Sequence, residues 1–318
     1  LEKATERQQL ILKLMAEQGK ITAEAKDAAV AEQLVYKNNE WKTNNVIAPY
    51  FLDVVWAEAE KVLAEKNHSI SEGGWTIQTT LNVAHQKAAE KVMNENMPKT
   101  DLQVGFVSMQ PHTGYVTALI GGRDYNTSSF NRVTAAKRQP GSILKTMLYA
   151  AAIENGYSPL TFMDVSETTF TYDRGKSNYT PQNINGKFAK EEIPLAKALA
   201  ISDNIYAVKT LQDIGYSTFN KTLKKFQLPT SDKEEPALAL GTTESTLYDL
   251  TSAYNKIASS GQGIEPTTIL SIKNAKGDIV YEASKMADEA EAVISEQQAA
   301  VLTHMLTGIF DPVYNDYS

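Results

Sequence analysis

The feature of this sequence that most constrains the fold is a Pro-Gly pair that leads directly into an apolar, helix-forming run. Pro140-Gly141 is followed by Ser142, and the run from Ile143 to Ile153 is rich in Ala, Leu and Met, residues that favour a helix. Because Pro and Gly interrupt whatever precedes them, we expect the helix to begin at Ser142. Its apolar composition predicts burial, so the rest of the chain must pack around it.

Ser142 also begins the only Ser-x-x-Lys pattern in the sequence, which Lys145 completes. Residues three apart on a helix share one face, so the hydroxyl and the amine can meet. A serine hydroxyl is a weak nucleophile near neutral pH and needs a neighbouring base, which a lysine can be when burial lowers its pKa. The N–H groups at the start of the helix favour developing negative charge. The pattern predicts a serine nucleophile activated without histidine. The alternative is a helix-capping serine beside a solvated lysine.

A second polar cluster, Ser202-Asp203-Asn204, lies at the junction of two predicted helices. Ser, Asp and Asn are all common helix N-caps, so capping alone would account for the cluster. A tight turn between helices can also point Ser202 and Asn204 into a cleft while its backbone caps the second helix. Ser129-Phe130-Asn131 has the same Ser-x-Asn spacing but precedes Ser142 in the chain.

The remaining chain alternates between helical and strand patterns, which predicts a mixed α/β (α+β) fold. Two antiparallel hairpins are expected, one spanning 102–120 with its turn at 111–114 and one spanning 267–281 with its turn at 274–277. The first should supply the opening strands of a central sheet, and a further strand is expected at 75–81. Helices are expected at 5–19, from 22 onward, and at 48–66, 82–96, 195–201, 204–214, 218–226, 246–260 and 295–307.

Three segments lack regular periodicity. Residues 37–47, rich in Asn and Lys, are expected to be a linker, and the acidic stretch 288–291 is expected to be solvated. Residues 157–190 form a long irregular stretch, and long loops in compact domains often carry function. Within it, Tyr179 to Asn183 either lines a cleft or belongs to a packed surface loop.

Composition excludes several classes of function. The formal net charge is −7 and Lys and Arg do not cluster, so no nucleic-acid partner is expected. Cysteine is absent, which excludes disulfides and thiolate metal sites. The four histidines have no metal-ligand spacing, and no cofactor is expected. No stretch approaches the roughly 18 apolar residues that span a bilayer.

The motifs around the Ser-x-x-Lys pattern resemble those of a known family. Phe130-Asn131-Arg132 followed by Arg138-Gln139-Pro140-Gly141-Ser142-x-x-Lys145 is similar to the first active-site motif of class A penicillin-binding proteins, and Ser202-Asp203-Asn204 to their second, Ser-x-Asn. The further segments that resemble the family are Gly73 to Leu81, Tyr179 to Asn183, Ala239 to Thr242 and Leu247 to Ala258. The third motif, Lys-Thr-Gly, does not occur after Asn204.

The resemblance implies a penicillin-binding/β-lactamase-like transpeptidase fold, a central antiparallel sheet flanked by helices and preceded by an N-terminal helical linker region. It divides the chain into 1–72, the helical tail of a glycosyltransferase domain and a linker, and 73–318, a transpeptidase domain without its C-terminal strands. The parent protein would carry a membrane anchor and a glycosyltransferase domain at the extracytoplasmic face of a bacterial membrane. The present chain is expected to be a soluble fragment cut short, and weakly active or inactive without those strands.

The resemblance also implies a role for each site residue. Ser142 would attack the carbonyl of a peptidoglycan stem peptide ending in D-Ala-D-Ala, and β-lactams would acylate the same serine. Lys145 would accept the hydroxyl proton, Ser202 would relay a proton to the leaving amine, and Asn204 would orient the substrate amide and hold Lys145. Other cell-wall synthesis proteins are possible partners. The alternatives are a D,D-carboxypeptidase or β-lactamase, which use water as acceptor, and a non-catalytic β-lactam sensor or cell-wall binding module.

Overall fold

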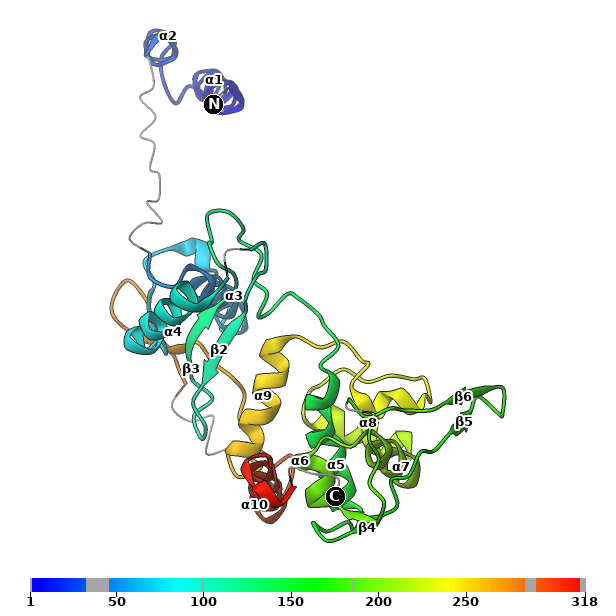
Figure 1. Cartoon of the computed structure of the whole chain (residues 1–318). Coiled ribbons are helices and arrows are strands. Elements are labelled where there is room, and N and C mark those ends of the chain that lie inside the picture. Colours follow the sequence, from blue (N-terminus) through cyan, green and yellow to red (C-terminus); the bar gives the residue numbers. More distant parts are fainter. Residues whose placement is uncertain (1, 33–45, 99, 185, 284–289, 315–318) are drawn as a thin grey trace. The chain divides into compact units, whose positions relative to one another are not determined.

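The computed structural model describes residues 2–32, 46–98, 100–184, 186–283 and 290–314. The chain forms two compact units, Leu1–Val46 and Ile47–Ser318, which are drawn in Figure 1. Most of the predicted linker at 37–47 and half of the predicted acidic stretch at 288–291 lie outside the described residues.

The first unit contains a pair of helices, α1 (Glu2–Glu17) and α2 (Ala23–Ala31). Thr22 caps α2, because its side-chain oxygen accepts a hydrogen bond from the Ala25 N–H at 3.2 Å. The two helices expected at the start of the chain are therefore confirmed.

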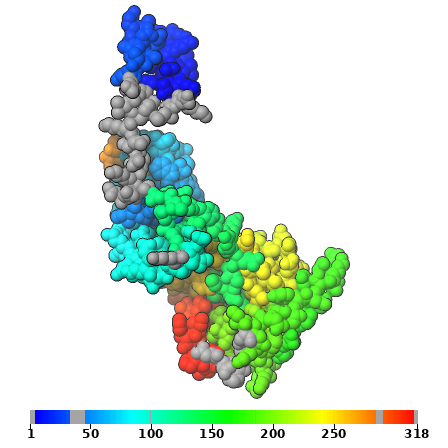
Figure 2. All heavy atoms as spheres, turned by 45° about the horizontal axis from the view of Figure 1, so that its top comes forward, coloured from blue at the N-terminus to red at the C-terminus, as the bar shows by residue number. Residues whose placement is uncertain are grey.

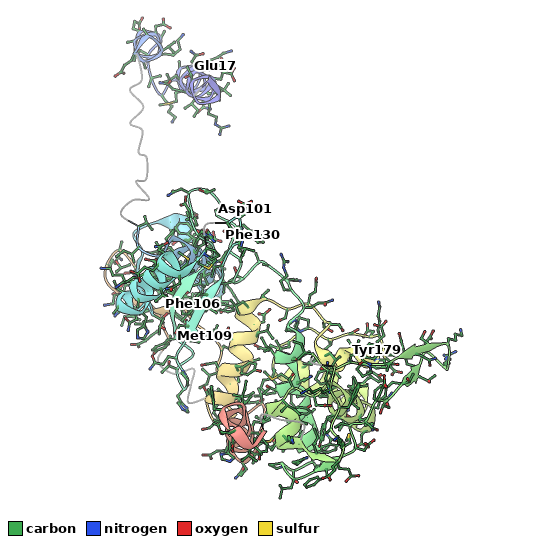
Figure 3. The ribbon with its side chains drawn as sticks, in the orientation of Figure 1. Glu17, Asp101, Phe106, Met109, Phe130 and Tyr179 are labelled. Carbon is green, nitrogen blue, oxygen red and sulfur yellow. The ribbon has the colours of Figure 1, made fainter. Side chains whose placement is uncertain are left out.

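The strands of the second unit form antiparallel sheets. β1 (Thr76–Thr79), β8 (Ile269–Lys273) and β9 (Ile279–Glu282) make one sheet in the order β1-β8-β9, and β2 (Phe106–Met109) pairs with β3 (Val116–Ile120). Phe106 and Met109, labelled at the two ends of β2 in Figure 3, lie opposite Ile120 and Val116. Both predicted hairpins are confirmed.

The two sheets meet at β3, although their ladders are not continuous. Tyr115 forms a parallel bridge with Thr267, and the Val116 N–H donates to the Thr267 carbonyl at 2.9 Å. The Thr80 hydroxyl spans the same junction by donating to the Val116 carbonyl at 2.7 Å. The expected central antiparallel sheet is therefore divided into two ladders that a bridge joins.

One helix of the predicted N-terminal region 1–72 lies in the second compact unit. The helix α3 (Pro49–Glu65) packs against β3 and β8, and Phe51, Ala59 and Leu63 on its inner face are completely buried there. This apolar face belongs to the core of the second unit, so the compact units separate between Val46 and Ile47.

Helices make up most of the other half of the second unit. They are α5 (Lys145–Glu154), α6 (Leu195–Ala200), α7 (Asn204–Ile214), α8 (Tyr216–Lys225), α9 (Leu247–Ala258) and α10 (Glu296–Thr307), whereas α4 (Val83–Asn96) packs on β3. The short 3₁₀ helices are η2 (Ile70–Glu72), η3 (Gly141–Leu144), η4 (Pro236–Leu240), η5 (Gly308–Phe310) and η6 (Pro312–Tyr314).

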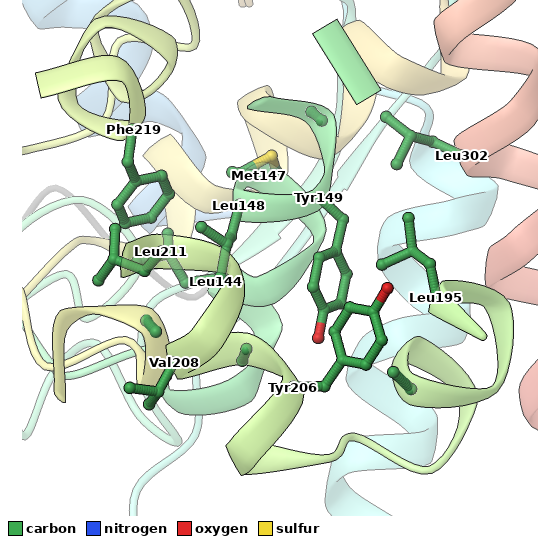
Figure 4. Packing of buried hydrophobic residues seen from close by; sticks show 14 of the residues in the cluster. Leu144, Met147, Leu148, Tyr149, Leu195, Tyr206, Val208, Leu211, Phe219 and Leu302 are labelled. Carbon is green, nitrogen blue, oxygen red and sulfur yellow. The ribbon is translucent and has the colours of Figure 1, made fainter. Parts of the chain in front are cut away.

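The central element of this half is α5. Every residue from Lys145 to Ala152 is buried, and the helix contacts α7, α8 and α10. Figure 4 shows Leu148 of α5 close to Leu211 of α7, and the ring of Tyr149 beside that of Tyr206. The two rings meet edge to face, and their centroids are 6.0 Å apart. The prediction that this apolar run is a buried helix around which the chain packs is confirmed.

Two local predictions need correction. The chain from Gly141 to Leu144 forms the 3₁₀ helix η3, so α5 begins at Lys145 and not at Ser142. The stretch 157–190 is not wholly irregular, because it contains β4 (Phe162–Met163), β5 (Phe170–Tyr172) and β6 (Ser177–Tyr179). β4 pairs with β7 (Ile193–Pro194), and β5 pairs with β6 in a hairpin that extends away from the helices (Figures 1 and 2). Pairs this short leave little periodicity to detect in a sequence.

Candidate active site

Ser142 and Lys145 lie at opposite ends of one 3₁₀ turn. The Lys145 N–H donates to the Ser142 carbonyl, which is the i→i+3 bond of that helix type, and residues three apart are eclipsed in it. Ser142 is exposed to solvent, whereas only 1% of the Lys145 surface is. The turn therefore presents a hydroxyl outside and a lysine inside.

Among the described residues, the hydrogen bonds of the Lys145 amine all go to the second motif. Nζ donates to the Ser202 carbonyl at 2.7 Å, to the Ser202 hydroxyl at 3.0 Å and to Asn204 Oδ1 at 2.6 Å. Burial lowers the pKa of Lys145 to about 8, and the nearby Asp203 carboxylate opposes part of that shift. A substantial fraction of the amine is therefore neutral near physiological pH and able to accept a proton.

The second motif occupies the turn between α6 and α7. Ser202 has φ 58°, the left-handed region, which for a non-glycine residue costs on the order of 1–3 kcal/mol and is often found at functional sites. Asp203 is completely buried and caps α7 by accepting from the Tyr206 N–H at 2.8 Å. The cap and the contact with Lys145 coexist, because Asp203 makes the first while Ser202 and Asn204 make the second.

The turn that carries Ser142 is held by residues that the sequence did not single out for this purpose. Tyr254 of α9 donates its hydroxyl to the Ile143 carbonyl at 2.8 Å and also contacts the Thr146 hydroxyl at 2.8 Å. On the other side, the Gly141 N–H donates to the Gly241 carbonyl at 3.1 Å. Gly241 belongs to the segment Ala239 to Thr242, which the sequence singled out only because it resembles a segment of the family.

A paired backbone contact holds the chain before Ser142. Arg138 and Ser245 form an antiparallel bridge in which each N–H donates to the other carbonyl, at 3.0 and 2.9 Å. The start of the nucleophile turn is therefore anchored to the chain that leads into α9.

Three of the four predicted site residues come together directly: Lys145, Ser202 and Asn204. Among the described residues, the Ser142 hydroxyl has no hydrogen-bond partner, so the expected contact between Ser142 and Lys145 is not made in this state. The other Ser-x-Asn sequence lies elsewhere: its Asn131 donates to the carbonyl of Tyr50, in the first turn of α3, at 3.3 Å. That second occurrence has a structural role.

The segment Tyr179 to Asn183 contacts the second motif directly. The Gln182 carbonyl accepts from Asn204 Nδ2 at 2.7 Å, and Asn183 Oδ1 accepts from the Asn204 N–H at 2.8 Å. The sequence left open whether this segment lines a cleft or is a packed surface loop. Its hydrogen bonds to Asn204 tie it to the candidate site, so it does more than pack on the surface.

A family comparison accounts for this arrangement. The family described as "Penicillin binding protein transpeptidase domain" matches residues 104–309, which include both motifs. The chain belongs to this family. The family resemblance and the transpeptidase fold that were predicted from the sequence are thereby confirmed.

Two relatives match nearly the whole chain, beyond the residues 104–309 that the family comparison covers. Penicillin-binding protein 2D of Bacillus subtilis (strain 168) is 39% identical over 317 residues, which cover 99% of this chain and 45% of that protein. Penicillin-binding protein 1F of the same strain is 33% identical over 316 residues, which cover 96% of this chain and 42% of that protein. The chain therefore spans less than half the length of either relative.

Solved structures share the fold. The crystal structure of penicillin-binding protein 1A from Haemophilus influenzae has a TM-score of 0.72 and 20% identity, covering 99% of this chain and 65% of that chain. PonA1 from Mycobacterium tuberculosis has a TM-score of 0.67 and 22% identity, covering 80% and 68%. At these identities the likeness concerns the fold alone.

Two features are absent from the ranges 2–32, 46–98, 100–184, 186–283 and 290–314. No helix there is both long enough and apolar enough to cross a membrane. No group of three or more His, Asp or Glu side chains there is arranged to hold a metal ion.

Proposed function

We propose that this chain is the acyl-transfer part of a serine D,D-transpeptidase that cross-links peptidoglycan stem peptides. The observation that carries the proposal is the Lys145 amine, which is buried, has a pKa of about 8 and is bonded to Ser202 and Asn204. Membership of the transpeptidase-domain family supports the same reaction class.

In the first half-reaction the Ser142 Oγ attacks the carbonyl carbon of the penultimate D-alanine. An ester bond to Oγ forms, the C–N bond to the terminal D-alanine breaks, and the hydroxyl proton passes to the neutral Lys145 amine. The Ser202 hydroxyl, 3.0 Å from Nζ, can both donate and accept, so it relays a proton to the leaving amine. Asn204 holds the lysine through Oδ1 and keeps one N–H for the substrate amide.

In the second half-reaction an amine from a neighbouring stem attacks the ester. A new C–N bond forms, the C–Oγ bond breaks, and the proton that the amine loses returns through Lys145 to Ser142. β-Lactams would enter the first half-reaction and remain as slowly hydrolysed esters. PonA1 has been solved with penicillin V, which supports this expectation for a protein of the same fold.

The whole protein is proposed to be larger than this chain. Residues 1–72 would join a glycosyltransferase domain to the transpeptidase domain, and an anchor would hold both at the extracytoplasmic face of a bacterial membrane. The match to less than half of each curated relative supports this arrangement.

Incubation with a penicillin is expected to raise the intact mass of the protein by the mass of the drug. The adduct should be absent from Ser142→Ala. The test is best made on the longest natural polypeptide that contains these residues, because no Lys-Thr-Gly motif follows Asn204 in this sequence. A stable adduct without transfer to an acceptor amine would indicate a sensor, and rapid release of the hydrolysed drug would indicate a carboxypeptidase or β-lactamase. Absence of any adduct would contradict the transpeptidase, the carboxypeptidase or β-lactamase, and the sensor, and would leave a binding module.

The rate of acylation is expected to rise with pH and level off above about pH 8. Only the neutral form of Lys145 accepts a proton, and the pKa of Lys145 is lowered to about 8. Below that pH, each further fall of one pH unit therefore removes about nine tenths of the neutral amine and slows acylation accordingly. Stopped-flow acylation with a fluorescent penicillin, at drug concentrations far below saturation, would give the profile. A rate that does not change through this range would show that the amine is not the titrating base.

A further inference from the structure

One buried side chain outside the four assigned residues contacts the second motif from a distant part of the chain. Asn183 follows the β5–β6 hairpin, and 5% of its surface is exposed. Its Nδ2 donates to Asp203 Oδ2 at 2.8 Å and to the Lys187 carbonyl at 2.9 Å, and its Oδ1 accepts from the Asn204 N–H at 2.8 Å. One amide therefore links the first residue of α7, the carboxylate that caps it and a returning loop.

These three partners fix the orientation of the Asn183 amide. The Asn204 N–H requires an acceptor, whereas the carboxylate and the carbonyl require donors, so a flipped amide would oppose each partner with a like group. The surrounding chain keeps the amide in place. Pro181 and Asn183 are buried while Gln182 and Ile184 are exposed, the alternation of an extended segment. Tyr179 marks the base of the hairpin from which this segment leaves (Figure 3).

The same segment also orients the Asn204 side chain. Asn204 Nδ2 donates to the Gln182 carbonyl at 2.7 Å, while Asn204 Oδ1 accepts from Lys145 Nζ at 2.6 Å. The Asn204 amide is thus held at one end by the backbone next to Asn183 and holds the lysine amine at its other end. A displacement of Asn183 would move both the backbone and the side chain of Asn204.

We propose that Asn183 is a positioning residue for acyl transfer at Ser142. It has no contact with Lys145 among the described hydrogen bonds and acts through Asn204, whose backbone it fixes to the start of α7. The inference rests on the proposed function, because the effect is expressed in the rate at which Ser142 is acylated.

Asn183→Ala is expected to lower the acylation rate at saturating fluorescent penicillin on the order of tenfold, the equivalent of about one hydrogen bond. The half-saturating concentration should change less, because the drug-binding surface remains. Asn204→Ala should lower the rate at least as much. The double variant should be no slower than Asn204→Ala alone, because the effect of Asn183 passes through Asn204.

Asn178→Ala provides the matched control. Asn178 lies in β6 of the same hairpin, is exposed, and its Oδ1 only accepts from the Thr171 hydroxyl at 2.9 Å, so acylation should be unchanged. Thermal unfolding of every sample identifies a folding defect. Where Asn183→Ala does not fold, Asn183→Gln, which moves the same amide by one methylene, should show the same loss.

Two outcomes would overturn this proposal while leaving the proposed function intact. In the first, folded Asn183→Ala or Asn183→Gln is acylated at the rate of the unsubstituted protein. In the second, the fold-losses in acylation rate of Asn183→Ala and Asn204→Ala multiply in the double variant. Failure of the unsubstituted protein to form a Ser142 adduct would overturn the proposed function and the role of Asn183 with it.

Discussion

Lys145→Met is expected to slow the acylation of Ser142 by a factor of about 10²–10⁴, the usual contribution of a general base. Methionine has a similar length and suits a buried position, so it removes the amine without opening a large cavity. The Ser202 hydroxyl and Asn204 Oδ1 would then lose the donor that both share. Intact mass recorded over time with excess penicillin would follow the loss. The rate that remains should no longer rise between about pH 7 and about pH 9, because the titrating amine is gone.

A second buried lysine provides the control for this prediction. Lys256 of α9 is also 1% exposed, but its Nζ donates to Gln227 Oε1 at 2.8 Å and pairs with Glu265 at 3.2 Å, away from both motifs. Lys256→Met should lower the thermal unfolding midpoint, because it removes the hydrogen bond to Gln227 and the ion pair with the partly exposed Glu265, and should leave the acylation rate of the folded protein unchanged. Equal acylation rates in Lys145→Met and Lys256→Met would remove Lys145 from the mechanism.

Local signals in the sequence predicted most of the elements because those signals act over a few residues. The helices expected at 82–96 and 295–307 begin with Asn82 and Ser295, common capping residues that accept hydrogen bonds from N–H groups in the first turns of α4 and α10. The bounds of α7 agree with prediction because Asp203 caps its start and Gly215 ends it. Each of these features is contained in one stretch of sequence.

The contacts that build the site could not be predicted in the same way, since they join residues far apart in the chain. Lys145 and Asn204 are 59 positions apart, and only the order of the motifs in a known family linked them. Tyr254 reaches the Ile143 carbonyl across 111 positions, and its place in an amphipathic helix gave no sign of that. The 3₁₀ turn at Ser142 follows from such contacts, which tie Gly141 and Ile143 to other segments. Helix propensity therefore placed the start of α5 three residues too early.

Gly241→Ala is expected to slow acylation on the order of 10²-fold, because catalysis is that sensitive to a displacement of about 1 Å. Gly241 has φ +76°, and a Cβ there would overlap the Gly141 carbonyl oxygen and lie 2.8 Å from the Gly141 carbonyl carbon and nitrogen. These are backbone atoms that cannot rotate away, and Gly141 immediately precedes Ser142. The substitution therefore pushes the nucleophile turn off the segment that supports it. Acylation rates with a fluorescent penicillin, together with thermal unfolding, would measure both effects.

Gly156→Ala separates the displacement of Ser142 from the strain of a positive φ. Gly156 ends α5 with φ +95°, and a Cβ there would meet nothing within 4 Å. Both alanine variants carry the left-handed penalty of about 1–2 kcal/mol, so both should unfold at lower temperature. Only Gly241→Ala should also lose acylation, because only there does the new methyl group reach the backbone that carries Ser142. If folded Gly241→Ala reacts as fast as Gly156→Ala, contact between the two glycines does not position the nucleophile, and the turn must be held by Tyr254 and the Arg138–Ser245 bridge alone.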